Sequence, residues 1–343
     1  MVRPRDTDQW REIIILKLEN PDRGYREIAS KVGTSISQVC RVWNWYLEQR
    51  AHDPEIKAID RREEMSDEDL EKFADLVAGL AQNIQDARDF QRETMLSVPG
   101  EDPVMVVFWG DLHYGAVGTD YERLKADVEE LSALKRSVIV GMGDYKDNAN
   151  PLVHKDSTHE SAVPPWIQDM IIKKMIREVN PKVLIRGCHD HWDYQTGTRD
   201  FVKNLCRECK PRAVNLWHGG LVNVHIGGEV YKIRARHKFR RESSLNTTNV
   251  QRALADEKGP VDVIAVAHKH FPDLQKVWKF EREIIYLRSG SYKHDDEFAQ
   301  RAGAWSGVYG VPAVVLMPDE HRVVPFWDFR EALVYLEGLK VVA

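Results

Sequence analysis

Residues 104–113 read VMVVFWGDLH, six apolar residues followed by a glycine, an aspartate and a histidine. Six consecutive apolar residues rich in Val and Phe are typical of a strand that is buried on both faces. The same pattern, a β-rich run that ends in His or Asp, recurs at residues 138–144, 183–190, 231–237 and 263–270. Ligands of open α/β sheets gather outside the carboxyl ends of the strands. We therefore expect these five strand ends to meet in one crevice.

The segments around these runs predict the fold class. Helical patterns occupy residues 121–134, 166–179 and 198–206, and further strand patterns occupy residues 221–225, 276–280, 284–288, 313–316 and 323–327. Strands and helices alternate at first, and the second half is rich in strands. This order predicts an α/β fold in which two sheets stack and helices lie outside.

The polar residues at the strand ends are candidate metal ligands: Asp111, His113, Asp144, His237, His268 and His270. Carboxylates combined with imidazoles suit divalent Mn, Fe, Zn or Ni. An aspartate can bridge two ions ~3.5–4 Å apart. In extended backbone, residues i and i+2 point to the same face, so the D-x-H and H-x-H pairs would each present two ligands at once.

Five motifs now stand in order: Asp111-Leu112-His113, Gly143-Asp144-Tyr145-Lys146-Asp147, Gly187-Cys188-His189-Asp190, His237, and Ala267-His268-Lys269-His270. They resemble the calcineurin-like metallophosphoesterase superfamily, which shows D-x-H, G-D-x-x-D, G-N-H-D/E, a single H and G-H-x-H in this order. The resemblance covers about Val104–Trp327. It implies a two-sheet α/β/β/α sandwich and hydrolysis of phosphoric esters.

The resemblance also implies a role for each residue. Asp111, His113 and His270 would hold a first metal ion, Asp144 would bridge, and His237 and His268 would hold a second. His189 would face the substrate phosphate, as general acid or as a stabiliser of the phosphoryl oxygens, and Asp147 would orient His189. The cofactors expected are two divalent ions, manganese first, with zinc, iron or nickel as alternatives. Such ions lower the pKa of water from ~15.7 toward ~7 and clamp the phosphate.

Two positions depart from the family pattern. Ala267 replaces a glycine, which is a mild change. Cys188 replaces an asparagine that is a ligand of the second metal. A Cys188 thiolate could take that place and would favour softer metals such as zinc or iron. Alternatively, Cys188 is a small buried residue and the second site is weaker.

Three further residues lie close to the predicted site in sequence. Arg240 and Arg241 follow His237 and could grip a substrate phosphate; the alternative is a solvated basic stretch. His191 lies two residues past His189 and could touch the edge of the site.

Residues 1–50 predict a small all-α domain. Residues 25–44, YREIASKVGTSISQVCRVWN, resemble a helix-turn-helix, with Gly33 at the turn. A recognition helix places its first residues at base edges in the major groove. The candidate DNA contacts are Ser35, Ser37, Gln38, Arg41 and Asn44, and Arg3, Arg5, Arg26 and Lys31 could meet phosphates. The alternative is a packing or protein-interaction module.

Residues 51–100 predict a charged helical linker. They hold thirteen acidic and six basic residues, a net charge of −7, whereas residues 1–50 carry +2. Leu70, Phe73, Val77, Leu80, Ile84 and Ala87 recur at spacings of three and four, as in an a/d seam. The seam could join two copies through residues 66–95 or pack on its own neighbouring domain. Ser97–Gly100 would end the linker, and residues 101–343 would form the metallophosphoesterase domain.

The bulk properties narrow the class of protein. The chain has 343 residues, 43% hydrophobic and 30% charged, as in globular proteins. No apolar run approaches the ~18 residues that would span a bilayer, and no cleavage site follows residues 13–16, so we expect a cytoplasmic protein with no membrane partner. Four cysteines are too few for a disulfide framework, and Cys206 and Cys209 are interpreted as helical cysteines.

Together the two ends of the chain predict a metal-dependent phosphodiesterase or nuclease directed at DNA. Fold resemblance alone does not choose a substrate. A phosphomonoesterase acting on proteins or nucleotides is therefore an alternative. A DNA-binding regulator whose phosphoesterase domain turns over little is another, and Cys188 is the residue that favours it.

Overall fold

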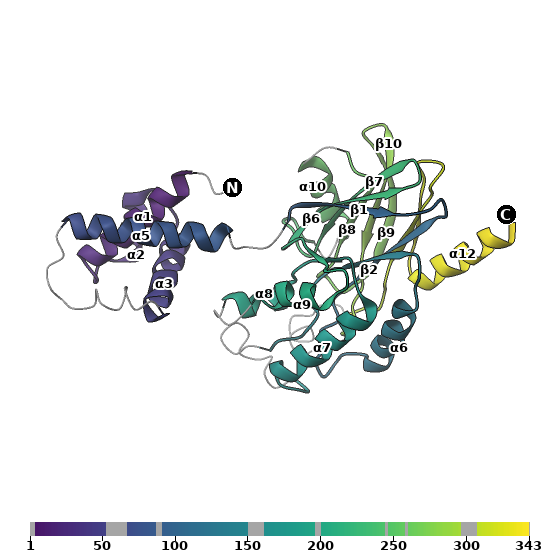
Figure 1. Cartoon of the computed structure of the whole chain (residues 1–343), viewed down its shortest axis with the longest axis horizontal. Helices are drawn as coiled ribbons and strands as arrows, with labels where there is room; N and C mark the ends of the chain where they lie inside the picture. Colours follow the sequence, from purple (N-terminus) through teal and green to yellow (C-terminus); the bar gives the residue numbers. More distant parts are fainter. Residues whose placement is uncertain are drawn as a thin grey trace. The chain divides into compact units, whose positions relative to one another are not determined.

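The computed structural model describes residues 4–52, 67–86, 91–149, 161–195, 200–243, 246–257, 260–295 and 307–342. The chain divides into two compact units, residues 1–89 and residues 90–343 (Figure 1). Each unit has its own hydrophobic core.

The first unit contains four described helices: α1 (Pro4–Glu19), α2 (Tyr25–Val32), α3 (Ile36–His52) and α5 (Asp67–Asp86). Gly33 ends α2 in the left-handed conformation at φ +70°, and its N–H donates to the carbonyl of Ala29. The hydroxyl of Ser35 accepts a 3.1 Å hydrogen bond from the N–H of Gln38, as expected for a residue that caps the next helix. The predicted pair of helices around a short turn is therefore present.

Helix α5 carries the predicted a/d seam. Phe73 and Val77 are buried in the core of the helical unit with Ile13, Ile14 and Val39. The ring of Phe73 meets that of Tyr46 at 5.7 Å between centroids. These two seam residues thus pack on their own unit; the side chains of Leu80 and Ile84, and all of Ala87, lie outside the described residues. Dimerisation through residues 66–95 stays a prediction.

The predicted linker is wrong at its C-terminal end. Residues Glu93–Val98 form strand β1, which pairs in parallel with β6 of the second unit. The strand was missed because it is short and only Thr94 in it is fully buried, so its sequence has no continuous apolar run. The sheet therefore begins before residue 101, the expected domain boundary.

Within the described residues, the second unit holds two six-stranded sheets. One has the order β1, β6 (Gly219–Ile226), β7 (Glu229–Arg236), β8 (Val263–Val266), β10 (Arg282–Arg288), β9 (Asp273–Lys279). The other has the order β12 (Val323–Phe326), β11 (Ala313–Leu316), β2 (Val104–Trp109), β3 (Ser137–Gly141), β4 (Val183–Leu184), β5 (Val214–Asn215). The predicted α/β class with two sheets is confirmed.

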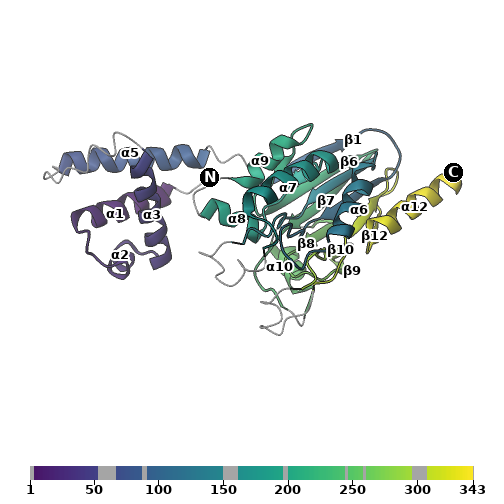
Figure 2. The same cartoon turned by 90° about the horizontal axis from the view of Figure 1, so that it is seen from below.

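Strand β2 shows how the layers form, because all six of its residues are buried. Val104, Val106 and Phe108 pack between the two sheets, and Met105, Val107 and Trp109 pack under the outer helices. Those helices are α6 (Tyr121–Ser132), α7 (Pro165–Val179), α9 (Phe201–Glu208) and α12 (Phe329–Val342), several of which Figure 2 shows along the sheet. Helix α10 (Asn249–Glu257) covers β8 and β10 on the opposite side. The layers are therefore helix, sheet, sheet, helix.

The sheet topology positions the site. Strands β2, β3 and β4 are parallel neighbours in one sheet, and β7 and β8 are parallel neighbours in the other. Their carboxyl ends therefore lie at one edge of each sheet. In the described part of the chain, no helix is long and apolar enough to cross a membrane.

Candidate metal centre

The five predicted strand ends converge. Ligand atoms within 4.8 Å of one another form four groups: Asp111, His113 and His270; Asp111, Asp144 and His237; His113, Asp144 and His189; and Cys188, His237 and His268. All six candidate ligands and Cys188 belong to these overlapping groups. The structure thus gathers every residue that the sequence nominated as a metal ligand.

Five of these residues have left-handed backbone: Asp111 (φ 49°), His113 (φ 44°), Asp144 (φ 51°), His268 (φ 76°) and His270 (φ 57°). Non-glycine residues rarely adopt this conformation, and clusters of such strain are typical of functional sites. The prediction that extended backbone aligns the D-x-H and H-x-H pairs is therefore wrong. The pairs lie beyond the strands, and left-handed turns bring their side chains together.

Two glycines permit the close approach of these turns. Gly143 has φ +96°, and a Cβ there would lie 2.5 Å from the nitrogen of Gly187. A Cβ on Gly187 would lie 2.0 Å from Oδ1 of Asp144. A side chain at position 187 would therefore displace the central carboxylate.

The first cluster comprises Asp111, His113 and His270. The Nε2 atoms of the two histidines lie 2.9 Å apart, and they lie 3.9 Å and 3.8 Å from Oδ1 of Asp111. Oδ1 of Asp111 is buried and has no hydrogen-bond partner among the described residues. Ligands ~2.1 Å from one ion lie about 3.0–3.4 Å from each other, so the two distances from Asp111 would shorten by about half an ångström around an ion. The donor set and its unpartnered oxygen fit a divalent cation.

Asp144 lies between the two clusters. Its Oδ2 is 3.8 Å from Nε2 of His113 and 3.1 Å from Nε2 of His237. Its Oδ1 accepts a 2.8 Å hydrogen bond from the N–H of His189, which fixes the carboxylate plane. One oxygen facing both clusters is the arrangement that a bridging ligand needs.

The second cluster comprises Cys188, His237 and His268. The sulfur of Cys188 lies 3.7 Å from Nδ1 of His268. Nδ1 of His237 lies 2.9 Å from the carbonyl oxygen of Met142, which can only accept, so Nδ1 carries the proton. Nε2 of His237 is thereby turned toward Asp144 as a donor atom for a metal.

Burial and charge suit these groups to metal binding. Burial, followed by the neighbouring His113, holds the pKa of His270 well below its usual range, and burial does the same for His268. Burial alone would raise the pKa of Asp144, but His237 and His189 outweigh it, and the pKa lies well below the usual range. Burial raises the pKa of Asp111 to about 6, although His237 opposes it. Burial alone would lower the pKa of His237, but Asp144 outweighs it and raises that pKa well above the usual range. His268 and His270 are thus neutral, whereas His237 and the ionised Asp144 form a charged pair.

Asp147 orients His189, as expected, but through its main chain and not through its carboxylate. Nδ1 of His189 donates to the backbone carbonyl of Asp147 at 2.5 Å, whereas the carboxylate oxygen is 3.9 Å away. That carboxylate instead lies 3.4 Å from Nδ1 of His113 and accepts a 3.1 Å hydrogen bond from Lys293. The Asp147 carboxylate lies in this position because Lys293, which is distant in sequence, places a buried positive charge beside it. Asp147 therefore orients His113 with its side chain and His189 with its main chain.

Sequence reasoning gave no role to Asp190 or Glu242. Both oxygens of Asp190 are used: Oδ2 accepts from the N–H groups of Asp144 (2.8 Å) and Gly187 (2.9 Å), and Oδ1 from that of Tyr145 (3.2 Å). The position of Asp190 at the end of the third motif could have indicated this role from the sequence. Oε2 of Glu242 lies 3.4 Å from Nε2 of His268, and nothing in the sequence around Glu242 indicated this contact.

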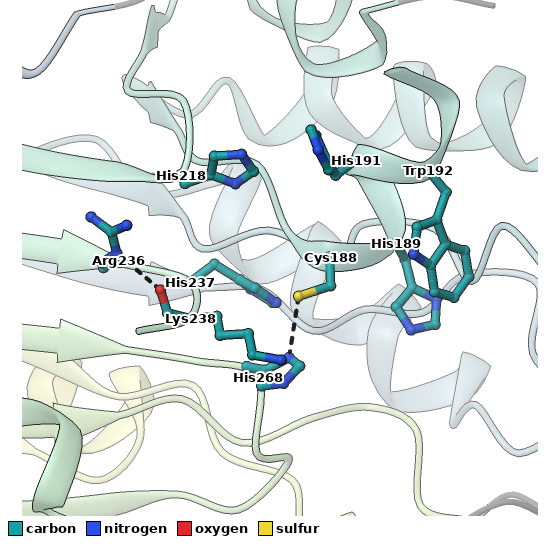
Figure 3. A pocket seen from close by; sticks show the side chains of 9 residues that line it. All are labelled: Cys188, His189, His191, Trp192, His218, Arg236, His237, Lys238 and His268. Atoms are coloured by element: carbon teal, nitrogen blue, oxygen red, sulfur yellow. Dashed lines mark hydrogen bonds between the residues drawn. The ribbon is translucent and has the colours of Figure 1, made fainter. Parts of the chain in front are cut away.

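A cavity of about 480 Å³ opens beside the second cluster (Figure 3). Its lining includes Cys188, His189, His268 and, as the sequence allowed, His191. Arg236 and Lys238 supply its positive charge.

Arg240 and Arg241 do not line this cavity, contrary to expectation; both are exposed, and the Arg240 guanidinium lies over the ring of Phe239. Both lie beyond the end of β7, in an irregular segment where their side chains face solvent. The structure therefore assigns the positive charge beside the site to Arg236 and Lys238 instead.

The candidate DNA contacts lie at the turn before α3 and in its first half. Ser35, Ser37, Arg41 and Asn44 are exposed, and Gln38 is half-buried with its amide 3.4 Å from Oε1 of Gln9. They are thus placed for an external partner, and DNA binding itself stays a prediction.

No protein-family model and no curated protein matches this chain. Solved structures that it resembles include Vps29 of Entamoeba histolytica complexed with Zn²⁺ (12% identity, 65% of this chain and 97% of that one, TM-score 0.32). Others are the sulfate thiohydrolase SoxB of Thermus thermophilus (11%, 66% and 57%, TM-score 0.36) and the calcineurin-like phosphoesterase YfkN of Bacillus subtilis (8%, 63% and 85%, TM-score 0.32). At these identities the likeness concerns the fold alone. With its two stacked mixed sheets and five ordered motifs, the second unit is similar to the calcineurin-like metallophosphoesterases.

Proposed function

We propose that this chain is a metal-dependent phosphoesterase that cleaves phosphodiester bonds, with DNA as its substrate. The observation that carries the proposal is the position of Asp144, whose Oδ2 lies between two clusters of metal-ligand type, 3.8 Å from His113 and 3.1 Å from His237. Two divalent ions held there would activate a water molecule and neutralise the phosphoryl oxygens.

His189 is the residue best placed to move a proton. Its side chain is 22% exposed, lines the cavity, and contacts the rings of His113 (4.5 Å) and Trp192 (4.0 Å). Burial, followed by His113, lowers the pKa of His189 to about 4, so the free site holds a neutral ring with its proton on Nδ1. A bound phosphate would favour the protonated ring, because its negative charge lies nearby. Nε2 would then donate its proton to the leaving oxygen.

The first unit supports DNA as the substrate. Helices α2 and α3 join through a three-residue turn and present polar side chains from Ser35 onward. A DNA-binding unit tethered to a phosphoesterase raises the local concentration of substrate. Arg236 and Lys238 beside the cavity add positive charge where a polyanion would pass.

The test is hydrolysis by metal-loaded full-length protein of four substrates: a chromogenic diester, a chromogenic monoester, duplex DNA and single-stranded DNA. We expect cleavage of the diester and of at least one DNA, and loss of both in Asp144→Asn. Preference for the monoester would identify a phosphatase and contradict the proposal.

One observation favours a second candidate, a DNA-binding regulator with little turnover. Cys188 stands where the family pattern has an asparagine ligand, so the second metal position differs from that of the resembled enzymes. Tight DNA binding without turnover on any of the four substrates would support the regulator.

A further inference from the structure

We infer that the second metal position is a thiolate site, built by Cys188, His237, His268 and Asp144, that selects zinc or iron(II) over manganese, and that Glu242 holds His268 in its binding orientation. This inference rests on the proposed metal centre and deepens it, because it replaces manganese as the ion expected at that position.

Three of the donors, Cys188, His237 and His268, come from separate segments and lie close together (Figure 3), and Asp144 joins them through His237. The sulfur of Cys188 lies 3.7 Å from Nδ1 of His268, and Oδ2 of Asp144 lies 3.1 Å from Nε2 of His237. His237 is 2% exposed, and its Nε2 faces the Asp144 carboxylate. This ring nitrogen is buried beside a thiol, a second imidazole and a carboxylate. A metal ion bound there would be coordinated by all four groups.

The separations fit zinc. Zn–S bonds of about 2.3 Å and Zn–N bonds of about 2.0 Å in tetrahedral geometry set a sulfur–nitrogen separation of about 3.6 Å. The measured value between Cys188 and His268 is 3.7 Å. One sulfur, two nitrogens and one oxygen also make up the four donors that zinc prefers.

The two clusters differ in the chemistry of their donors. The first offers one carboxylate and two imidazoles, which manganese and zinc both accept. The second adds a thiolate, a soft ligand that favours zinc or iron(II) and not manganese. Helix α8 (Cys188–Gln195) begins at Cys188, the residue that would supply this ligand.

Glu242 fixes the orientation of His268. Its carboxylate is 11% exposed, and Oε2 lies 3.4 Å from Nε2 of His268 while Nδ1 of the same ring faces Cys188. Oε1 of Glu242 is buried without a hydrogen-bond partner among the described residues. A carboxylate that accepts from Nε2 leaves Nδ1 without a proton and directs its lone pair toward the metal. Glu242 is therefore a positioning residue and not itself a ligand.

The first experiment reads the thiolate directly, without substrate. Full-length protein, stripped with a chelator, is titrated with Co²⁺ and followed by absorption. We expect the sulfur-to-cobalt charge-transfer band in wild type and in Cys40→Ser, a control in the other unit, and its loss in Cys188→Ser. No band in wild type, or a band that survives in Cys188→Ser, would overturn the inference.

The second experiment measures selectivity and the role of Glu242. Wild type dialysed against equal Zn²⁺ and Mn²⁺ should retain zinc at the thiolate site, and the ratio of zinc affinity to manganese affinity at that site should fall in Cys188→Asn. Glu242→Gln should keep the cobalt band but bind zinc about 10–100 times more weakly. If that variant fails to fold, Glu242→Asp serves in its place. Unchanged zinc affinity in folded Glu242→Gln, or an unchanged zinc-to-manganese affinity ratio in Cys188→Asn, would contradict the assignment.

Metal binding and hydrolysis can fail separately. A cobalt band in a protein that cleaves no ester would preserve this inference and remove the proposed function. Hydrolysis by a protein that shows no cobalt band would support the proposed function and overturn this inference.

Discussion

His113 and His270 face each other through their Nε2 atoms, 2.9 Å apart, beside the same oxygen of Asp111. Burial and His113 keep the pKa of His270 well below its usual range, so that ring is neutral. Two imidazole nitrogens and a carboxylate oxygen gathered at one point are a donor set that a divalent cation would bind. We therefore expect a bound cation to stabilise the fold.

Metal loading should therefore raise the melting temperature. At an ion concentration of 100 times Kd, binding stabilises by about 2.7 kcal/mol, which corresponds to about 5–10 °C for a unit of this size. Scanning calorimetry of the chelated and reloaded protein measures the shift. His270→Ala should lose a large part of it, and an equal shift in that variant would show that the ion binds elsewhere.

His189→Ala and Asp147→Asn should separate catalysis from metal binding. His189 lines the cavity and is not among the ligands proposed for either ion, so His189→Ala should lower kcat about 10²–10⁴-fold while metal content stays at the wild-type level. Asp147→Asn should lower metal affinity, because that carboxylate lies against His113 and Lys293. Steady-state kinetics with metal analysis of each variant provides the measurement. Near-normal turnover in His189→Ala would remove its role.

Asp190→Asn should destabilise the second unit by about 2–3 kcal/mol. Three backbone N–H groups donate to the Asp190 carboxylate, and an amide cannot accept from all of them on both sides. The loop that carries Asp144 should shift, so metal affinity should fall too. Urea denaturation of the metal-free protein tests the first effect; a variant as stable as wild type would contradict it.

His321 should make stability depend on pH. Its ring nitrogens lie 2.7 Å from Glu229 and 3.0 Å from Asp262; burial opposes the charged ring, but these carboxylates outweigh it and raise the pKa of His321 above 6.5. A raised pKa in the folded state stabilises fully below the unfolded pKa of 6.5, and this stabilisation is lost as pH rises through the folded value. His321→Gln should therefore cost more stability at pH 6 than at pH 9. Denaturation curves at both pH values decide, and equal losses would exclude the linkage.

The sequence alone determined the strands and their ends. A strand such as residues 104–109, buried on both faces, needs a continuous apolar run, and such runs can be recognised without neighbours. Each such run ends where Asp or His follows. This change identified Asp111, Asp144, His237 and His268 as candidate ligands. Strand β1 was missed because a half-exposed strand carries no such run, and its pairing with β6 comes from more than 120 residues later in the chain.

Only the tertiary structure decided which atoms meet. Left-handed turns align the ligand pairs. This backbone conformation costs energy in residues other than glycine, so the local sequence does not favour it. Surrounding contacts, such as those of Asp190, hold it in place. Lys293 draws the Asp147 carboxylate away from His189, and Glu242 reaches His268 from another loop. Residue types therefore revealed the chemistry of the site, whereas the orientation of each donor depends on long-range packing, which no local pattern records.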